Sequence, residues 1–151
     1  MEQRNFELEY RAGDNELKAE EFIAFANKVW PGDYDLEKTE EAISKTLNIT
    51  ARHNNMLIGA LRILTDGYFF GTITELLVLP EYQRQRIGSR LLALAKDSAQ
   101  TILYFGAQPG KEPFYEKNGC KKCSLMSLST VNELRQYDSS TKISIFNDFR
   151  D

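Results

Sequence analysis

Three strand-like segments follow one another along the chain with no helix between them, and this run limits the fold more than any other feature. They are residues 48–55, 56–64 and 68–79. Turn dipeptides end them, since Asn54-Asn55 closes the first segment and Asp66-Gly67 lies between the second and the third. Short connections of this kind join antiparallel neighbours. The run therefore predicts three adjacent antiparallel strands in one sheet.

Helical and strand-like segments flank this run on both sides. Apolar residues at helical spacing predict four helices, at residues 15–30, 36–48, 87–99 and 112–118. Further strands are predicted at residues 5–11, 101–107, 122–129 and 142–146. The continuous apolar run at 101–107 is typical of a central strand covered on both faces. The order predicts an α+β fold of one domain, residues 1–151, with helices on both faces of a mixed, mostly antiparallel sheet.

The size and charge of the chain exclude several classes of protein. With 151 residues, 42% of them hydrophobic, the chain matches one soluble domain that can bury a sizeable core. A formal net charge of −3 argues against a general nucleic-acid binder, which needs a basic face. No apolar run approaches the roughly 20 residues of a membrane span, and the first residues lack the apolar core of a signal peptide. We therefore expect a cytoplasmic protein with no membrane or nucleic-acid partner.

Two cysteines three positions apart, Cys120 and Cys123, raise the question of a metal or redox site. A zinc site would need a second pair of ligands, but the only histidine, His53, is distant in sequence. A thioredoxin-like pair would lie at the start of a helix, whereas this pair leads into a strand-like run. We interpret the cysteines as reduced thiols and expect no bound metal.

The junction between the third strand and the next helix, residues 80–92, is a candidate anion site. A helix that begins here presents unpaired N–H groups and the positive end of its dipole, which suit a phosphate. Gly88 lies in the first turn, where glycine costs about 1 kcal/mol relative to alanine. Close approach of a ligand to the backbone would explain this glycine. The alternative is an ordinary helix start with exposed arginine and glutamine side chains. P-loop and Rossmann sequences are absent.

Two stretches resemble motifs of the GNAT superfamily, the acetyl-CoA-dependent N-acyltransferases. The first is "LLVLPEYQRQRIGSRLLALA", similar to the family pattern Q/R-x-x-G-x-G/A. Gln83 matches its first position and Gly88 its last, while Arg86 stands where the family usually has its first glycine. The second is "FYEKNGC", residues 114–120, similar to a later family signature in which phenylalanine stands at the position of Cys120. The resemblance spans about residues 5–128 and implies the GNAT-like fold.

The resemblance implies acetyl-CoA as co-substrate and a set of residues that bind it. The backbones of Leu77, Val78 and Leu79 would hold the pantetheine arm and the thioester carbonyl, while their side chains belong to the core. The pyrophosphate would bind mainly to main-chain N–H groups of the junction, from Gln83, Arg84, Gln85, Arg86, Ile87, Gly88 and Ser89. The guanidinium of Arg86 would add positive charge near the pyrophosphate.

The resemblance also implies a general acid and suggests a base. Tyr115 matches the tyrosine that protonates the departing thiolate, and a phenol of ordinary pKa about 10 is protonated at neutral pH. An aromatic residue that only packs is the alternative. Glu75 lies in an apolar strand, on one face with Ile73, Leu77 and Leu79, and could accept the amine proton through a water. An ordinary edge or solvent-facing glutamate explains Glu75 equally well.

These features together predict an N-acetyltransferase that transfers an acetyl group to a primary amine by direct attack in a ternary complex. The amine could belong to a small molecule, a peptide or a protein, and Asp33 and Asp35 could attract a cationic acceptor, although a solvated loop is the favoured interpretation. A non-catalytic acyl-CoA-binding module is the alternative, and a larger acyl group is a third possibility. Residues 142–146 could supply the edge of a homodimer.

Overall fold

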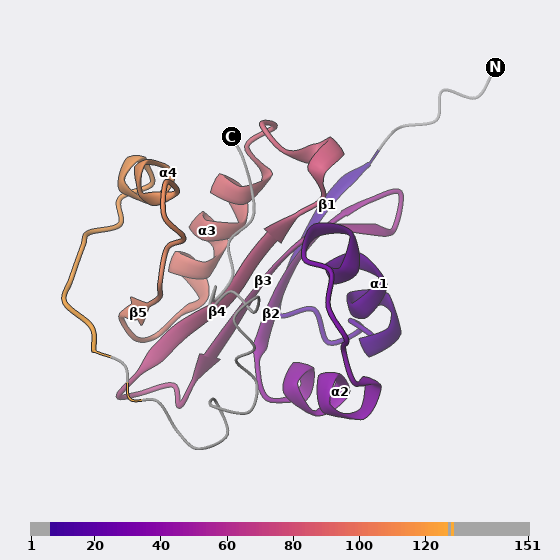
Figure 1. Ribbon diagram of the computed structural model, residues 1–151, viewed down its shortest axis with the longest axis horizontal. Coiled ribbons are helices and arrows are strands. Elements are labelled where there is room, and N and C mark those ends of the chain that lie inside the picture. The colour runs from indigo at the N-terminus through magenta and orange to yellow at the C-terminus, as the bar shows by residue number, and fades with distance from the viewer. Residues whose placement is uncertain (1–6, 127, 129–151) are drawn as a thin grey trace.

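The computed structural model describes residues 7–126 and residue 128, and in this part the chain forms one five-stranded sheet (Figure 1). The strands are β1 Leu8–Ala12, β2 Leu47–His53, β3 Met56–Thr65, β4 Gly71–Val78 and β5 Leu103–Tyr104. They lie in the order β1-β2-β3-β4-β5, with β1 to β4 antiparallel and β5 parallel to β4. The predicted meander and the mixed, mostly antiparallel sheet are confirmed.

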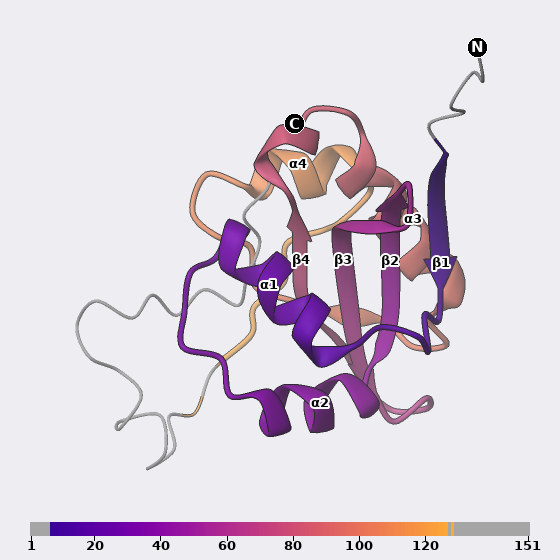
Figure 2. The ribbon, with the colours of Figure 1, turned by 90° about the vertical axis from the view of Figure 1, so that its right-hand side faces the viewer.

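Helices cover both faces of this sheet. Helices α1 Ala19–Val29 and α2 Leu36–Ser44 lie against one face, and α3 Ile87–Ser98 lies against the other (Figures 1 and 2). A short 3-10 helix, η1 Pro80–Tyr82, precedes α3, and α4 Glu112–Lys117 lies on the α3 side (Figure 1). The predicted α+β architecture is thus confirmed. None of the described helices has the length and apolar character needed to cross a membrane.

Alternate residues of β3 face the two helical layers. A side-chain carbon added to Gly59 would lie 3.1 Å from Leu91 and 3.2 Å from Ile87, so the absence of a side chain here lets α3 approach the sheet closely. Arg62 faces the other layer, where its guanidinium lies 5.2 Å from the ring centre of Phe22 in α1. Because both faces are covered, β3 is apolar at most positions instead of alternating with polar residues.

A register shift in β4 changes which residues share a face. Arg62 pairs with Glu75, but the next residue of β3, Ile63, pairs with Ile73, so Thr74 is an extra residue in β4. The strand pattern predicts Ile73 on the face of Glu75, and this is wrong, because the bulge turns Ile73 to the face of α3. Leu77 remains on the face of Glu75, towards α1.

Several predicted boundaries are wrong. The first helix begins at Ala19 and not at residue 15, and in two further elements side-chain hydrogen bonds shift the boundary. The second helix ends at Ser44 and not at residue 48, since Asn48 belongs to β2 and its Nδ2 donates to the Ile43 carbonyl at 3.1 Å. The third strand begins at Gly71 and not at residue 68. Asp66 accepts the backbone N–H groups of residues 68–70 through Oδ1, at 2.8 to 3.1 Å, which folds these residues into the turn.

The prediction of a central strand over residues 101–107 is also wrong. β5 contains only Leu103 and Tyr104 and lies at the edge of the described sheet, where it pairs with Gly71 and Thr72 alone. None of residues 101–107 is fully buried, so this apolar run predicted neither the burial of the segment nor the number of its neighbours. Residues 122–126 form no strand, contrary to the prediction for 122–129.

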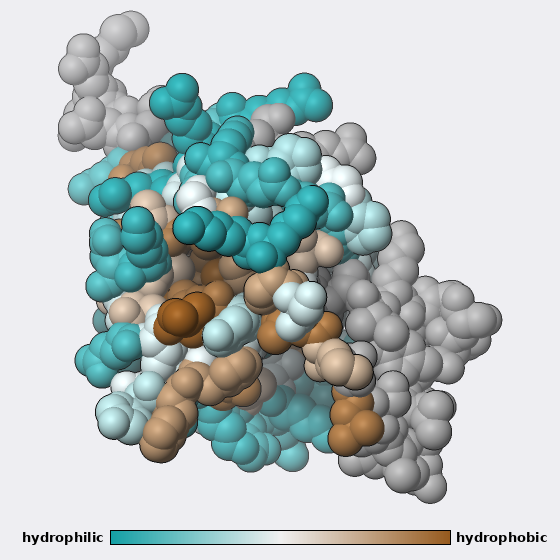
Figure 3. Space-filling model, turned by 90° about the vertical axis from the view of Figure 1, so that its left-hand side faces the viewer, coloured by the Kyte–Doolittle hydropathy of each residue, from teal (hydrophilic) through white to brown (hydrophobic). Residues whose placement is uncertain are grey.

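Apolar side chains are exposed at the β3–β4 turn and next to β5. Phe69 and Ile102 are 84% and 73% exposed, and Phe70 stacks on Tyr104 with ring centres 5.4 Å apart. Figure 3 shows apolar side chains in the middle and lower part of the face that lies on the left in Figure 1. Apolar surface of this kind is typical of a contact face. The predicted dimer strand, residues 142–146, lies outside the described residues.

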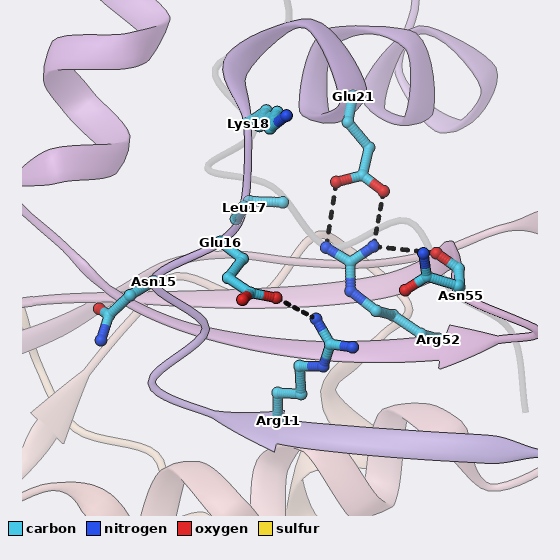
Figure 4. Close-up of a pocket in the computed structure, with 8 residues that line it drawn as sticks. All are labelled: Arg11, Asn15, Glu16, Leu17, Lys18, Glu21, Arg52 and Asn55. Carbon is cyan, nitrogen blue, oxygen red and sulfur yellow. Dashed lines mark hydrogen bonds and ion pairs between the residues drawn. The ribbon is translucent and has the colours of Figure 1, made fainter.

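A buried charge network joins β2 to the segment before α1. The side chain of Arg52 is 4% exposed, and its guanidinium binds Glu21 and the backbone carbonyl of Asn55 (Figure 4). The same group donates to Asp14 at 3.2 and 3.1 Å, and Thr50 donates to Asp14 at 2.7 Å. All five N–H groups of Arg52 therefore have an acceptor. Arg52 lines an open pocket of about 660 Å³ but offers a ligand no free donor there.

The network predicts an acid-sensitive contribution to stability from Asp14. Burial alone would raise the pKa of Asp14, but hydrogen bonds from Thr50, the Glu16 N–H and Arg52 outweigh it and hold the pKa below its usual range. The stabilisation is therefore present above about pH 4, the ordinary aspartate value, and is lost as the pH falls through the lower folded value. We expect Asp14→Asn to lower the free energy of unfolding by about 3 kcal/mol at pH 7 and by much less at pH 2. Denaturant unfolding at the two pH values measures this difference.

The matched control is Glu41→Gln, which removes a carboxylate from an exposed ion pair with Lys45 and should change the stability little at either pH. A cost of Asp14→Asn that stays constant from pH 7 to pH 2 would contradict this account of the network.

Candidate active site

The candidate site begins where β4 ends. The chain leaves β4 at Val78, makes the single turn of η1 and enters α3 at Ile87 (Figure 1). Residues 83–86 connect η1 to α3, and the side chains of Arg84, Gln85 and Arg86 are exposed. The predicted junction thus forms a loop that leads directly into the first turn of a helix.

Two arginines in this loop adopt the backbone conformation that glycine favours. Arg84 and Arg86 both have φ of +62°, in the left-handed region. Arg86 is the N-cap residue of α3, with ψ of 13°, and stands at the position where the resembling family usually has glycine. The loop therefore keeps the conformation that a glycine would adopt, although each arginine there costs about 1 kcal/mol or more.

The first turn of α3 presents backbone donors without a side-chain cap. Arg86 makes no side-chain hydrogen bond to the helix, and the first turn contains no acidic residue. Within the part of the chain that the structure describes, neither Arg84 nor Arg86 forms an ion pair. Uncapped N–H groups, the positive end of the helix dipole and two guanidinium groups make this terminus suited to an anion.

The two glutamines of the loop hold its shape. Gln83 Nε2 donates to the Val78 carbonyl at 3.0 Å, and Gln85 Nε2 donates to the Glu81 carbonyl at 3.1 Å. Each side chain thus ties the loop back to the segment before it. These contacts give both side chains a structural role, so a ligand would meet chiefly the main chain of the loop.

The remaining predicted residues of the loop differ in exposure. Ile87 is 2% exposed and belongs to the core, so only its backbone can reach a ligand. Gly88 is also buried, and Ser89 is half-buried. The prediction that the N–H groups of this turn would be the ligand-binding atoms is compatible with these positions.

The end of β4 has an open side. Pairing with β5 covers Gly71 and Thr72 only, so the later residues of β4 have no strand partner there among the described residues. The N–H of Leu79 donates to the Ile58 carbonyl of β3 at 2.9 Å. Because alternate residues of a strand direct their N–H groups to opposite neighbours, the N–H of Val78 faces the open side. The side chains of Leu77, Val78 and Leu79 are buried in the core, as predicted.

Tyr115 lies in α4 with its ring packed among aromatic groups. Its ring centre is 4.6 Å from that of Phe105 and 5.1 Å from that of Phe114. The predicted helix end at Gly119 is confirmed, since Gly119 has φ of +87° and the Cys120 N–H returns to the Tyr115 carbonyl at 2.9 Å. Burial, with a smaller effect of Cys120, raises the pKa of Tyr115, so its hydroxyl is protonated at neutral pH.

Glu75 is buried and ion-paired, and sequence reasoning did not predict the ion pair. Arg62 donates to both carboxylate oxygens of Glu75, through Nε and through Nη2 at 3.1 Å. The two side chains are only 13% and 10% exposed. Burial and, to a lesser extent, the charge of Glu75 raise the pKa of Tyr34. Glu75 is therefore not a solvent-facing glutamate.

The other candidates from the sequence have structural or surface positions. Asp35 caps α2 by accepting the Lys38 N–H at 2.8 Å, and Asp33 is exposed in the loop between α1 and α2. Cys120 is half-buried, Cys123 is exposed, and both are free thiols. The described residues include no group of three metal-binding side chains.

A family model identifies the chain. The model described as an acetyltransferase (GNAT) domain matches residues 14–128. The chain belongs to the GNAT acetyltransferase family. A comparison with curated proteins gives no match. The matched residues include strands β2 to β5 and the loop before α3.

Solved GNAT structures share the fold of this chain. A GNAT-family acetyltransferase from Streptococcus pneumoniae TIGR4 is 24% identical, with a TM-score of 0.64 over 83% of this chain and 98% of that one. An aminoglycoside N-acetyltransferase in complex with CoA is 15% identical, with a TM-score of 0.65 over 86% and 98%. A glucosamine-6-phosphate N-acetyltransferase from Arabidopsis thaliana is 13% identical, with a TM-score of 0.62 over 83% and 99%. At these identities the likeness concerns the fold.

Sequence reasoning missed two residues related to Glu75 in this GNAT domain: Arg62, its ion-pair partner, and Tyr34, to whose raised pKa the charge of Glu75 contributes. A signal for Arg62 was available, because it is the one charged residue of an otherwise apolar segment that pairs with the strand of Glu75. A buried carboxylate in one strand usually requires a cation in its neighbour. Tyr34 comes from the α1–α2 connection, and nothing in the sequence relates it to β4.

The loop conformation predicts how substitutions of Arg86 affect stability. Arg86→Gly removes the strain of a left-handed arginine but raises the conformational entropy of the unfolded chain. We therefore expect the free energy of unfolding to stay within about 1 kcal/mol of wild type. Arg86→Val places a β-branched residue at positive φ and should cost about 1–2 kcal/mol more. Denaturant unfolding measures both. Arg90 is an exposed residue within α3, so Arg90→Val is the control. It should lower the free energy of unfolding by only about a few tenths of a kcal/mol. Equal stability of the glycine and valine variants would contradict the left-handed conformation.

Proposed function

We propose that this GNAT domain, residues 1–151, is an N-acetyltransferase that transfers the acetyl group of acetyl-CoA to a primary amine. The observation that carries the proposal is the uncapped first turn of α3 immediately after the unpaired end of β4. One element offers donors for a diphosphate, and the other offers a backbone edge for an extended thioester arm. Membership of the acetyltransferase family supports the same reading.

The residues present fit the pyrophosphate of acetyl-CoA. The first turn of α3 has no acidic side chain that would repel it, and Arg84 and Arg86 supply two positive charges without competing carboxylates among the described residues. Main-chain N–H groups from Gln83 to Ser89 would bind the phosphate oxygens. Acetyl-CoA supplies an activated acetyl thioester, and the chain's own groups orient it and move protons.

The open edge of β4 supports the next part of the proposal. The N–H of Val78 would donate to the thioester carbonyl and stabilise the negative charge that develops on this oxygen when the amine attacks. The backbones of Leu77 and Leu79 would hold the neighbouring arm, since their side chains fill the core. The amine attacks the carbonyl carbon directly in the ternary complex, and the carbon–sulfur bond then breaks.

Two side chains would move the protons of this reaction. Tyr115 would donate its phenolic proton to the leaving thiolate, because burial keeps the phenol protonated at neutral pH. Glu75 would accept a proton from the attacking amine through a water, and Arg62 would hold its carboxylate in place. We propose a small-molecule amine as acceptor. Two solved GNAT structures with the same fold support this class, since they are acetyltransferases for aminoglycosides and for glucosamine 6-phosphate.

Acetyl-CoA should stabilise the folded protein, and a single negative charge in the first turn of α3 should weaken this effect. At 100 times its dissociation constant, the ligand stabilises the native state by about 2.7 kcal/mol, a shift of several degrees in thermal unfolding. Ser89→Glu adds a carboxylate that suits the helix dipole, so the apo protein should be as stable as wild type or slightly more stable. The same carboxylate repels the pyrophosphate, and we expect at least a tenfold loss of acetyl-CoA affinity.

Ala93→Glu is the matched control, because it adds the same charge on an exposed position of the same helix. It should leave the affinity for acetyl-CoA close to that of wild type. No thermal shift of wild type with millimolar acetyl-CoA, or equal losses in the two variants, would contradict the binding site.

Tyr115→Phe should separate catalysis from binding. The variant keeps the ring that packs on Phe105 but lacks the hydroxyl, so acetyl-CoA affinity should change less than twofold while kcat falls about 100-fold. Because the raised pKa keeps the phenol protonated, wild-type kcat should not decline on the alkaline side below about pH 10 through this group. Thiol release measured with an amine substrate tests both points. Unchanged turnover in the variant would show that Tyr115 is not the acid, and no turnover with any amine would favour a binding module.

A further inference from the structure

The guanidinium of Arg62 has N–H groups without a hydrogen-bond acceptor among the described residues. Its Nε and Nη2 bind Glu75, and its face lies over the ring of Phe22. The remaining nitrogen, Nη1, is buried and has no hydrogen-bond partner among the described residues. A buried guanidinium N–H without an acceptor is unfavourable, so this nitrogen is a site that an oxygen atom would occupy.

The second buried arginine of the sheet shows the contrast. Arg52 lies on β2 and also faces α1, but all five of its N–H groups are bound by Asp14, Glu21 and the Asn55 carbonyl. The hydrogen-bonding capacity of Arg52 is therefore fully satisfied within the fold. Arg62 has the same chemistry and a similar depth, yet only one acidic partner.

The position of Arg62 relates the unused donor to the proposed reaction centre. On the face towards α1, the pair Arg62–Glu75 is followed by the pair Ala60–Leu77. Two residues along a strand span about 7 Å, so Arg62 lies one such step along the sheet from the backbone proposed to hold the thioester.

We propose that Arg62 is a specificity-determining residue whose Nη1–H binds an oxygen atom adjacent to the reacting amine of the acceptor. This inference rests on the proposed acetyltransferase function and deepens it. The charge of Arg62 is already balanced by Glu75, so the free donor suits a neutral oxygen better than a second carboxylate. The acceptor class is therefore a vicinal amino alcohol, in which the amine faces the thioester and the neighbouring hydroxyl accepts from Nη1.

The wild-type protein tests this with two amines that differ by one oxygen, trans-2-aminocyclohexanol and cyclohexylamine. At equal concentrations of the unprotonated amine, we expect kcat/KM for the amino alcohol to be about 10- to 100-fold higher, the effect of one hydrogen bond to a charged group. Equal values, or acetylation of neither amine, would overturn the proposal. Thermal unfolding with acetyl-CoA separates this failure from failure of the proposed function, because the cofactor shift does not depend on the acceptor.

Arg62→Lys tests the residue. Lysine keeps the positive charge beside Glu75 but lacks the fork that provides Nη1. The ratio of kcat/KM between the two amines should fall to about 1, whatever happens to the rates themselves. A purely structural role would lower both rates and leave the ratio unchanged, which would overturn the assignment. Arg52→Lys is the control, since its guanidinium is fully paired, and it should keep the wild-type ratio.

Discussion

The separation of β4 from β5 after two residue pairs is the constraint on which the proposed site depends. If the pairing continued, the N–H of Val78 would be used by β5 and no backbone edge would remain for an extended ligand. The chain reaches this arrangement because β4 runs on for six residues beyond Thr72, held by β3 alone, and then turns through η1 into α3. The open edge and the uncapped helix terminus are therefore neighbours in the chain, and one ligand can use both.

The loop between these two elements shows that backbone conformation can be kept when the usual residue is absent. Arg86 adopts the left-handed conformation at the family's glycine position, at an energetic cost that the surrounding contacts sustain. Gln83 and Gln85 contribute two of these contacts by binding carbonyl groups of the preceding segment. In return, the arginine places a positive charge at the helix terminus that glycine would not provide.

The face of the sheet towards α1 carries two buried arginines with different roles. The complete network around Arg52 fixes the segment before α1 on β2 and stabilises the fold. The incomplete pair of Arg62 and Glu75 joins β3 to β4, and its unused donor distinguishes it from a purely structural pair. A buried charged group that lacks one partner in the free protein is typical of a site that is completed by a ligand.

Local sequence patterns predicted most of the fold, and non-local pairing explains what they missed. The turn at Asn54-Asn55, the helix after Arg86 and the stop at Gly119 follow from side-chain and backbone preferences of a few residues, and the structure confirms them. The bulge at Thr74, the short β5 and the pairing of Glu75 with Arg62 depend on how distant strands align, which alternation along one strand does not encode. The left-handed conformation of Arg86 does not follow from its residue type. Only its place in the family motif, where glycine usually stands, indicates that conformation.

Hydrogen–deuterium exchange with and without coenzyme A would test the central claim most directly. The account predicts that coenzyme A slows amide exchange in residues 77–90, at the open end of β4 and the first turn of α3, and leaves β1 and the pocket around Arg52 unchanged. Exchange that slows around Arg52 instead, or that does not change in residues 77–90 at saturating coenzyme A, would contradict it.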